Sequence, residues 1–184
     1  MKYTQNQQYI LTEVSDFMLA IKAKAGSKKS YSTLYGRYFK KIYRYVYWRA
    51  GGDRQLAEDL TQQALITGWE KIGSFNSFRG SFRAWIFTIV HNSMVDYFRR
   101  HHQQSRIEKY LEVSGNDDGE RLLNTLSVEQ ALSELNTEQK NVIILRFLEG
   151  LSVKATARIV GKTNQAVRAI QYRALQKLKK ILEV

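Results

Sequence analysis

The sequence predicts an all-α protein made of two small helical domains joined by a flexible linker. Apolar residues recur every three or four positions along most of the chain, and no segment of useful length alternates as a β-strand does. The 184 residues contain no proline, so helices can run without interruption, and no cysteine, which excludes disulfides and zinc sites with thiolate ligands. With 43% hydrophobic residues, the chain can bury one medium-sized core or two small ones.

Four helices are expected in a first domain, residues 1–104. Ser15 or Asp16 can cap the first helix, and Asp53, which directly follows two glycines, can cap the third. The segment GSFNSFRG before the fourth helix is rich in glycine and serine and indicates a loop. The expected helices are 15–25, 30–49, 53–72 and 81–102, with a polar break at 26–29 and the loop at 73–80.

A second domain of four helices is expected over residues 128–184. The polar, acidic stretch containing SGNDDGE lies in residues 105–127 and predicts the flexible linker. Gly161 can end a short amphipathic run with a left-handed backbone step, and Thr163 can cap the long run that follows. Two helices joined by such a turn predict a helix-turn-helix. The expected segments are 128–135, 138–149, 152–160 and 163–181.

The last of these segments separates into two faces at about 100° per residue. Arginine and glutamine on its polar face are suited to paired hydrogen bonds with guanine and adenine, so this helix can enter a DNA major groove. An ordinary surface helix with a solvated polar face is the alternative interpretation. The apolar face holds Val167, Ile170, Ala174, Leu178 and Ile181, with Ala166 at its margin. The opposite face holds Gln165, Arg168, Ala169, Tyr172, Gln176 and Lys179.

Charge favours the nucleic-acid interpretation. The formal net charge is +12, and the basic residues lie mainly in the two domains, on either side of the acidic linker. Such domains bind polyanions by neutralising phosphates and releasing counterions. An anionic membrane would attract them too. However, the sequence contains no long apolar span and no signal-peptide pattern, so we expect a soluble cytoplasmic protein without membrane insertion.

Aromatic residues and histidines suggest two further kinds of site. Most aromatics of the second helix are expected to fill the core, but a loop that carries Phe75, Phe78 and Arg79 can hold an unstacked base. Alternatively, Phe75 and Phe82 simply fill the core. The three histidines have no carboxylates at ligand spacing. We therefore expect no catalytic residue, no metal and no cofactor.

Two segments of the first domain carry a more specific pattern. They are LAEDLTQQALITGWEKIGSF and FRGSFRAWIFTIVHNSMVDYFRR, and the second contains the motif W-x₆-N-x₃-D-x₂-RR from Trp85 to Arg100. These segments resemble region 2 of the extracytoplasmic-function (ECF) sigma factors, and residues 135–181 resemble their region 4. The resemblance covers residues 12–104 and 128–182 and implies a protein that binds core RNA polymerase and directs promoter recognition and DNA melting. Such a protein is not an enzyme.

The resemblance also assigns roles to residues. Region 2 is expected to hold the polymerase clamp, and region 4 the flap. The polymerase-binding residues implied are Glu58, Asp59, Gln62 and Gln63. For the two acids, simple solvation of a helix face is the alternative. The residues implied for capture of the melted −10 element are Phe75, Asn76, Ser77, Phe78, Arg79, Trp85, Asn92, Arg99 and Arg100. For Asn92, a hydrogen bond between helices is the alternative.

Region 4 is expected to recognise the −35 element. The residues implied are Gln165, Arg168, Ala169, Tyr172 and Arg173. The chain departs from the family pattern at several positions, because Asn136 and Asn164 replace usual prolines, Lys162 an apolar residue and Ala166 a frequent threonine. The resemblance further implies an anti-sigma factor as partner and no obligate homo-oligomer. Two other classes remain open: a stand-alone helix-turn-helix regulator that needs no polymerase, and a nucleic-acid-processing enzyme.

Overall fold

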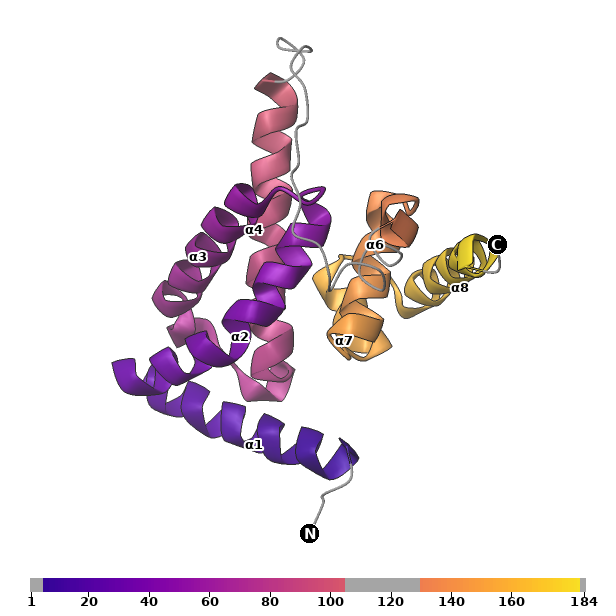
Figure 1. Cartoon of the computed structure of the whole chain (residues 1–184). Helices are drawn as coiled ribbons and strands as arrows, with labels where there is room; N and C mark the ends of the chain where they lie inside the picture. Colours follow the sequence, from indigo (N-terminus) through magenta and orange to yellow (C-terminus); the bar gives the residue numbers. More distant parts are fainter. Residues whose placement is uncertain (1–4, 105–129, 183–184) are drawn as a thin grey trace, which may run out of the picture.

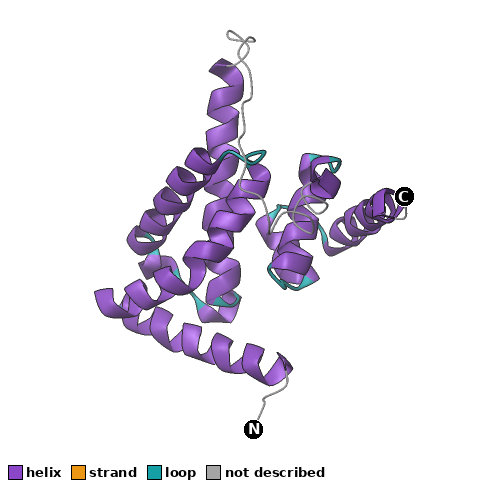
Figure 2. Cartoon of the chain, viewed as in Figure 1, coloured by secondary structure: helices purple, strands orange, loops and turns teal. Residues whose placement is uncertain are grey.

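The structure is a computed structural model that describes residues 5–104 and 130–182 (Figure 1). All regular elements of these residues are helical, which confirms the predicted all-α class (Figure 2). The N-terminal part contains α1 (Gln5–Lys24), α2 (Lys28–Arg49), α3 (Arg54–Glu70), the 3₁₀ turns η1 (Ile72–Ser74) and η2 (Ser77–Arg79), and α4 (Phe82–Gln104). The C-terminal part contains α6 (Thr137–Ile143), the π-helical turn η3 (Ile144–Leu148), α7 (Val153–Ile159) and α8 (Asn164–Leu182).

Local capping chemistry explains most helix starts. Asp53 Oδ1 accepts a hydrogen bond of 2.9 Å from the backbone N–H of Leu56 at the start of α3, as expected. The Thr163 hydroxyl accepts one of 3.1 Å from the N–H of Ala166 at the start of α8, also as expected. Between α7 and α8, Gly161 has φ +65°, a left-handed conformation that glycine adopts without strain. The helix-turn-helix is therefore built as the sequence predicts.

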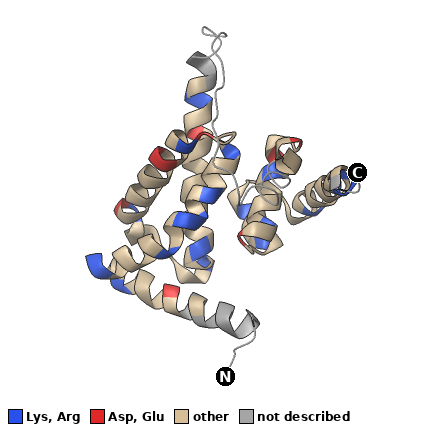
Figure 3. Cartoon of the chain, in the orientation of Figure 1, with Lys and Arg blue, Asp and Glu red and all other residues tan. Residues whose placement is uncertain are grey.

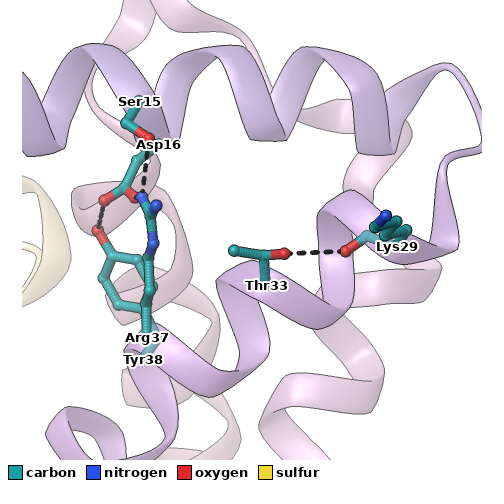
Figure 4. A network of polar contacts seen from close by, with 6 residues as sticks. All are labelled: Ser15, Asp16, Lys29, Thr33, Arg37 and Tyr38. Atoms are coloured by element: carbon teal, nitrogen blue, oxygen red, sulfur yellow. Dashed lines mark hydrogen bonds and ion pairs between the residues drawn. The ribbon is translucent and has the colours of Figure 1, made fainter.

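The expected start of the first helix is wrong, because α1 begins ten residues before Ser15. Asp16 is not a cap but a buried residue within α1, where its carboxylate accepts hydrogen bonds from Arg37 Nη1 at 2.7 Å and from Tyr38 Oη at 2.5 Å (Figure 4). Ser15 also accepts from Arg37. Burial, and next the hydrogen bond to Asp16, raise the pKa of Tyr38. The carboxylate thus ties α1 to α2.

Some expected segments fall partly or wholly outside the described residues. The linker at 105–127 lies outside them entirely. Of the helix expected at 128–135, residues 130–133 are helical, and 128–129 lie outside. The helix expected at 138–149 is observed as α6 followed by the turn η3. None of the helices that the structure describes is long and apolar enough to cross a membrane.

The main hydrophobic core is shared by the N-terminal and C-terminal parts. Ile42, Tyr45 and Phe87 of α2 and α4 belong to the same buried cluster as Leu145 and Leu151. In Figure 1, α6 and α7 accordingly lie beside α2 and α4. Two smaller clusters hold α8 to the rest of the C-terminal part. The two parts therefore form a single packed unit in this structure.

Candidate nucleic-acid and protein interfaces

The long helix α8 buries one face and exposes the other, as its sequence pattern predicts. Val167, Ile170 and Ala174 are buried, and pack α8 against α6 and α7. All five residues implied for −35 recognition are exposed, and Tyr172 exposes 65% of its surface. They are Gln165, Arg168, Ala169, Tyr172 and Arg173. This face presents hydrogen-bond donors, a small apolar side chain and an aromatic ring, which suits contacts to base edges and phosphates.

Polar contacts within the C-terminal part hold α8 and the turn before it in place. Arg146 of η3 donates to Gln171 Oε1 at 3.0 Å and also to the carbonyl of Leu151. Lys162 forms an ion pair of 2.8 Å with Glu138 in the first turn of α6. These contacts hold the helix-turn-helix against α6, so the exposed face of α8 has a defined orientation.

The loop between α3 and α4 has a buried base and an exposed tip. Phe75 is only 1% exposed, and its ring packs against Phe82 at 5.9 Å and Trp85 at 5.7 Å between ring centroids. Phe78, by contrast, is 99% exposed. Asn76 Oδ1 accepts a hydrogen bond of 2.9 Å from the N–H of Phe78 and so shapes the turn η2. The packed rings of Phe75, Phe82 and Trp85 support a loop whose tip exposes the ring of Phe78.

The remaining residues implied for the −10 element differ in exposure. Asn92, Arg99 and Arg100 are exposed on α4, whereas Trp85 is half-buried on the same helix. Arg99 forms an ion pair of 3.1 Å with Asp96, one turn earlier. Arg79 and Ser77 belong to η2, and Arg79 is exposed. The exposed members extend from the loop along α4, a path that a strand of nucleic acid can follow.

The polar residues of α3 form a separate exposed face. Glu58, Asp59, Gln62 and Gln63 are all exposed, and Figure 3 shows the acidic positions on this helix. Gln55 donates a hydrogen bond of 3.3 Å to Asp59. On the other side of α3, Ala57, Leu60 and Ala64 are buried against the core. This face has the opposite charge to most of the chain, which suits a protein partner rather than DNA.

Among the described residues, the histidines belong to no cluster of three or more His, Cys, Asp or Glu side chains that could hold a metal ion. His91 is buried, with Nδ1 2.9 Å from Tyr45 Oη, and burial, followed by the charge of Arg49, lowers its pKa to about 4. It is therefore neutral at physiological pH. The His101 ring stacks on Tyr97 at 3.9 Å between centroids.

Contacts between the two parts were not expected from the sequence. Arg44 of α2 forms an ion pair of 2.6 Å with the buried Glu149, and Arg83 of α4 donates to the carbonyl of Glu149 at 3.2 Å. Arg158 of α7 donates to the carbonyl of Arg79 in the loop. The sequence offers one sign of such a contact: Glu149 is an acidic residue directly after the apolar run VIILRFL.

Comparison with known proteins covers both parts of the chain. Residues 34–104 match the family model of sigma-70 region 2, and residues 131–180 match that of sigma-70 region 4. The ECF RNA polymerase sigma factor BldN of Streptomyces coelicolor is 35% identical over 173 residues, which are 89% of this chain and 64% of BldN. This chain thus spans less than two thirds of BldN. The ECF sigma factor SigX of Bacillus subtilis is 27% identical over 85% of this chain and 86% of SigX.

Solved structures show the same fold. CnrH in complex with the cytosolic domain of CnrY matches with a TM-score of 0.69 and 25% identity, over 92% of this chain and 97% of CnrH. The sigma factor RpoE in complex with the anti-sigma factor NepR from Bartonella quintana matches with a TM-score of 0.74 and 24% identity, over 85% of this chain and 98% of RpoE.

Proposed function

Because this chain belongs to the ECF group of RNA polymerase sigma factors, with sigma-70 regions 2 and 4, we propose that it binds core RNA polymerase and directs it to promoters. Members of this family are transcription initiation factors and not catalysts. One observation carries the proposal most directly: a single chain combines an exposed acidic face on α3, an exposed aromatic loop and an exposed basic reading helix. We assign residues 1–104 to region 2, 105–127 to the linker and 128–184 to region 4.

In this proposal, α3 binds the polymerase clamp. Glu58, Asp59, Gln62 and Gln63 are exposed together and are not needed for packing, which supports a role in binding a partner. The flap contact belongs to region 4. There, Phe147 and Leu148 of η3 are apolar and partly exposed, at 51% and 37%, and provide a surface that such a contact would cover.

The loop with Phe78 captures an unstacked base of the −10 element. The 99% exposure of Phe78 supports stacking on a base, and binding of the open strand then shifts the melting equilibrium without any catalytic group. Phe75 is too deeply buried to contact DNA in this structure, so we revise its expected role from contact to support of the loop. Asn92 contacts the non-template strand, while Arg99 and Arg100 bind phosphates.

Region 4 reads the −35 element through α8. Arg168 and Gln165 offer donors to base edges, Ala169 and Tyr172 offer apolar contacts, and Arg173 reaches a phosphate. The protein acts in the cytoplasm with the polymerase, without forming an obligate homo-oligomer. An anti-sigma factor is a further proposed partner, since the solved relatives CnrH and RpoE are described in complexes with CnrY and with the anti-sigma factor NepR.

The test is transcription of fragmented genomic DNA from the source bacterium by its core polymerase, followed by sequencing of the transcript 5′ ends. Adding the protein should create a set of start sites that share a −10 and a −35 sequence. Phe78→Ala should reduce initiation from these sites, and the matched control Phe17→Ala, a partly exposed phenylalanine on α1, should not. Start sites that are unchanged by the protein, together with tight duplex binding by the protein alone, would favour the stand-alone helix-turn-helix regulator.

A further inference from the structure

One face of α1 exposes apolar side chains that nothing in the described part of the chain covers. Phe17, Met18 and Ile21 lie in adjoining turns of α1 and expose 39%, 50% and 42% of their surfaces. At about 100° per residue these three residues, here called the α1 apolar face, lie together and opposite to the buried Ala20 and Ala23. Single exposed apolar residues are ordinary, but three that adjoin on one helix indicate an interaction site.

The packing of α1 holds this face outward. α1 contacts α2, α4 and the turn η1, and Figure 1 shows it along one edge of the molecule with these elements on one side of it. On its inner side, the ion pair between Asp16 and Arg37 ties α1 to α2. The α1 apolar face is therefore already formed and oriented toward solvent, so a partner that binds it does not have to order the helix first.

The spacing of the apolar residues fits a partner that is itself a helix. Phe17 and Ile21 are four residues apart, and in the sequence Val14 and Ile10 precede Phe17 at intervals of three and then four residues. Alternating intervals of three and four form the heptad pattern, by which two helices insert side chains between each other. An amphipathic helix that binds along such a seam is a recurrent mode of protein recognition. The pattern therefore indicates that a helix lies along α1 in the complex.

Charge beside the α1 apolar face selects the chemistry of this partner. Lys22 and Lys24 border the face on its two sides, and Lys28 and Lys29 follow at the start of α2; all four are exposed. Figure 3 shows basic residues gathered where α1 turns into α2, and the sequence of α2 contains no acidic residue. Acidic side chains next to the apolar seam of the partner are therefore attracted to this end of α1.

We propose that the α1 apolar face is the docking site for an amphipathic helix of another protein, whose apolar seam is flanked by acidic residues. Two copies of this chain each carry a net charge of +12 and repel each other, which disfavours α1 of a second copy as the occupant. The site uses neither Phe78 nor the exposed faces of α3 and α8, so it is separate from the contacts proposed for polymerase and promoter. It is nevertheless close to the promoter loop, because Lys24 Nζ donates to the carbonyl of Phe75 at 3.0 Å.

The first experiment measures the binding of two synthetic helical peptides to the full chain by fluorescence anisotropy. Both peptides carry the same leucine seam at heptad spacing, but glutamates flank it in one peptide and lysines in the other. The acidic peptide should bind at least about tenfold more tightly than the basic one, and Ile21→Glu should weaken its binding by at least about tenfold. The matched control is Ile66→Glu on α3: Ile66 is 52% exposed and the change in charge is the same, so binding should not change. Equal affinities of the two peptides, or equal losses in the two variants, would overturn the proposal.

A second variant guards against loss of the helix itself. If Ile21→Glu lowers the helical circular dichroism of the chain, Met18→Glu takes its place, since Met18 is more exposed, at 50%. The same loss of binding to the acidic peptide is expected, and unchanged binding would overturn the proposal.

The second experiment tests which molecule occupies the face in the source bacterium. A photocrosslinking side chain at position 18 of the full chain should join it to a different protein, within a segment whose heptad apolar seam is flanked by Asp or Glu. Cross-links to a second copy of this chain, to a segment without such a seam, or to no protein would overturn the proposal. So would binding of the wild type, but not of Ile21→Glu, to vesicles of phosphatidylglycerol and phosphatidylethanolamine. Because no measurement here depends on transcription, failure of the proposed function would leave these outcomes unchanged.

Discussion

Replacing Arg44 with methionine removes one side of the closest ion pair between the two regions. Loss of one partner from a fully buried pair costs about 3–5 kcal/mol, because the other charge stays buried. Glu149 meets that condition with 1% exposure, but Arg44 is 46% exposed, so water screens part of the interaction. We therefore expect Arg44→Met to lower the free energy that holds region 4 against region 2 by about 1.5–3 kcal/mol, the range for a hydrogen bond to a charged group. This corresponds to about a 10- to 150-fold smaller equilibrium constant for the packing of region 4 against region 2 near neutral pH.

The size of this effect should depend on pH. With region 4 packed against region 2, burial raises the pKa of the Glu149 carboxyl above its usual range, and Arg44, Lys41 and Arg83 oppose that rise only in part. The packed chain therefore binds this proton more tightly than a chain in which the contact is broken, and the contact is favoured as pH falls through the raised pKa toward the ordinary value of about 4.3. Without Arg44 the pKa rises further. The loss caused by Arg44→Met should thus be largest near neutral pH and shrink on acidification.

The free energy of unfolding of wild type and of Arg44→Met, measured by chemical denaturation from about pH 8 down to about pH 5, tests this dependence. His91 also lies in the shared region of the core, but burial lowers its pKa to about 4, so it remains neutral over this range. In a Glu149→Gln background, Arg44→Met should have a much smaller effect at every pH, since no buried charge is left unpaired. An Arg44→Met effect that is independent of pH, or undiminished by Glu149→Gln, would refute the assignment of the coupling to this pair.

Four other substitutions separate stability from function. Phe78→Ala should leave thermal stability within about 0.5 kcal/mol of wild type yet weaken open-complex formation by about 1–3 kcal/mol; Phe75→Ala should instead cost about 3–5 kcal/mol of unfolding free energy by chemical denaturation. Gly68→Ala should destabilise region 2, because a Cβ there would lie 2.5 Å from the hydroxyl oxygen of Tyr31, and a lower melting temperature by calorimetry checks this. Arg168→Ala should relax selection at one −35 base pair by about 1–3 kcal/mol in a randomised-promoter assay, and an unaltered preference would exclude it from recognition.

Features governed by neighbouring residues could be predicted from the sequence. The caps at Asp53 and Thr163 and the left-handed turn at Gly161 depend on groups within three residues, and each is observed. The two faces of α8 follow from helical periodicity alone, so the prediction that Val167 and Ile170 lie on the apolar face is also confirmed by their burial.

Features that depend on distant partners could not be predicted in this way. Asp16 has the chemistry of a cap, but Arg37 and Tyr38, more than twenty residues away, place it inside α1. Likewise, nothing local to Glu149 reveals that Arg44, 105 residues earlier, lies beside it. Burial of Phe75 beneath an exposed Phe78 is a similar case, because both residues occur in the same short loop and differ only in tertiary contacts.

Two of the departures from the family pattern in region 4, Asn136 and Lys162, have structural explanations that leave its reading face intact. Asn136, in place of a proline, forms a capping box: its Oδ1 accepts from the N–H of Gln139 at 2.9 Å, and Gln139 Oε1 accepts from the N–H of Asn136 at 3.2 Å. Lys162, in place of an apolar residue, forms an ion pair with Glu138, which lies in the first turn of α6. Both substitutions thus act on the start of α6 and stabilise it against the turn before α8. Their partners, Gln139 and Glu138, belong to α6 and not to the exposed face of α8. The −35 preference should therefore follow the exposed residues of α8, and Lys162→Leu should lower stability more than it changes promoter choice.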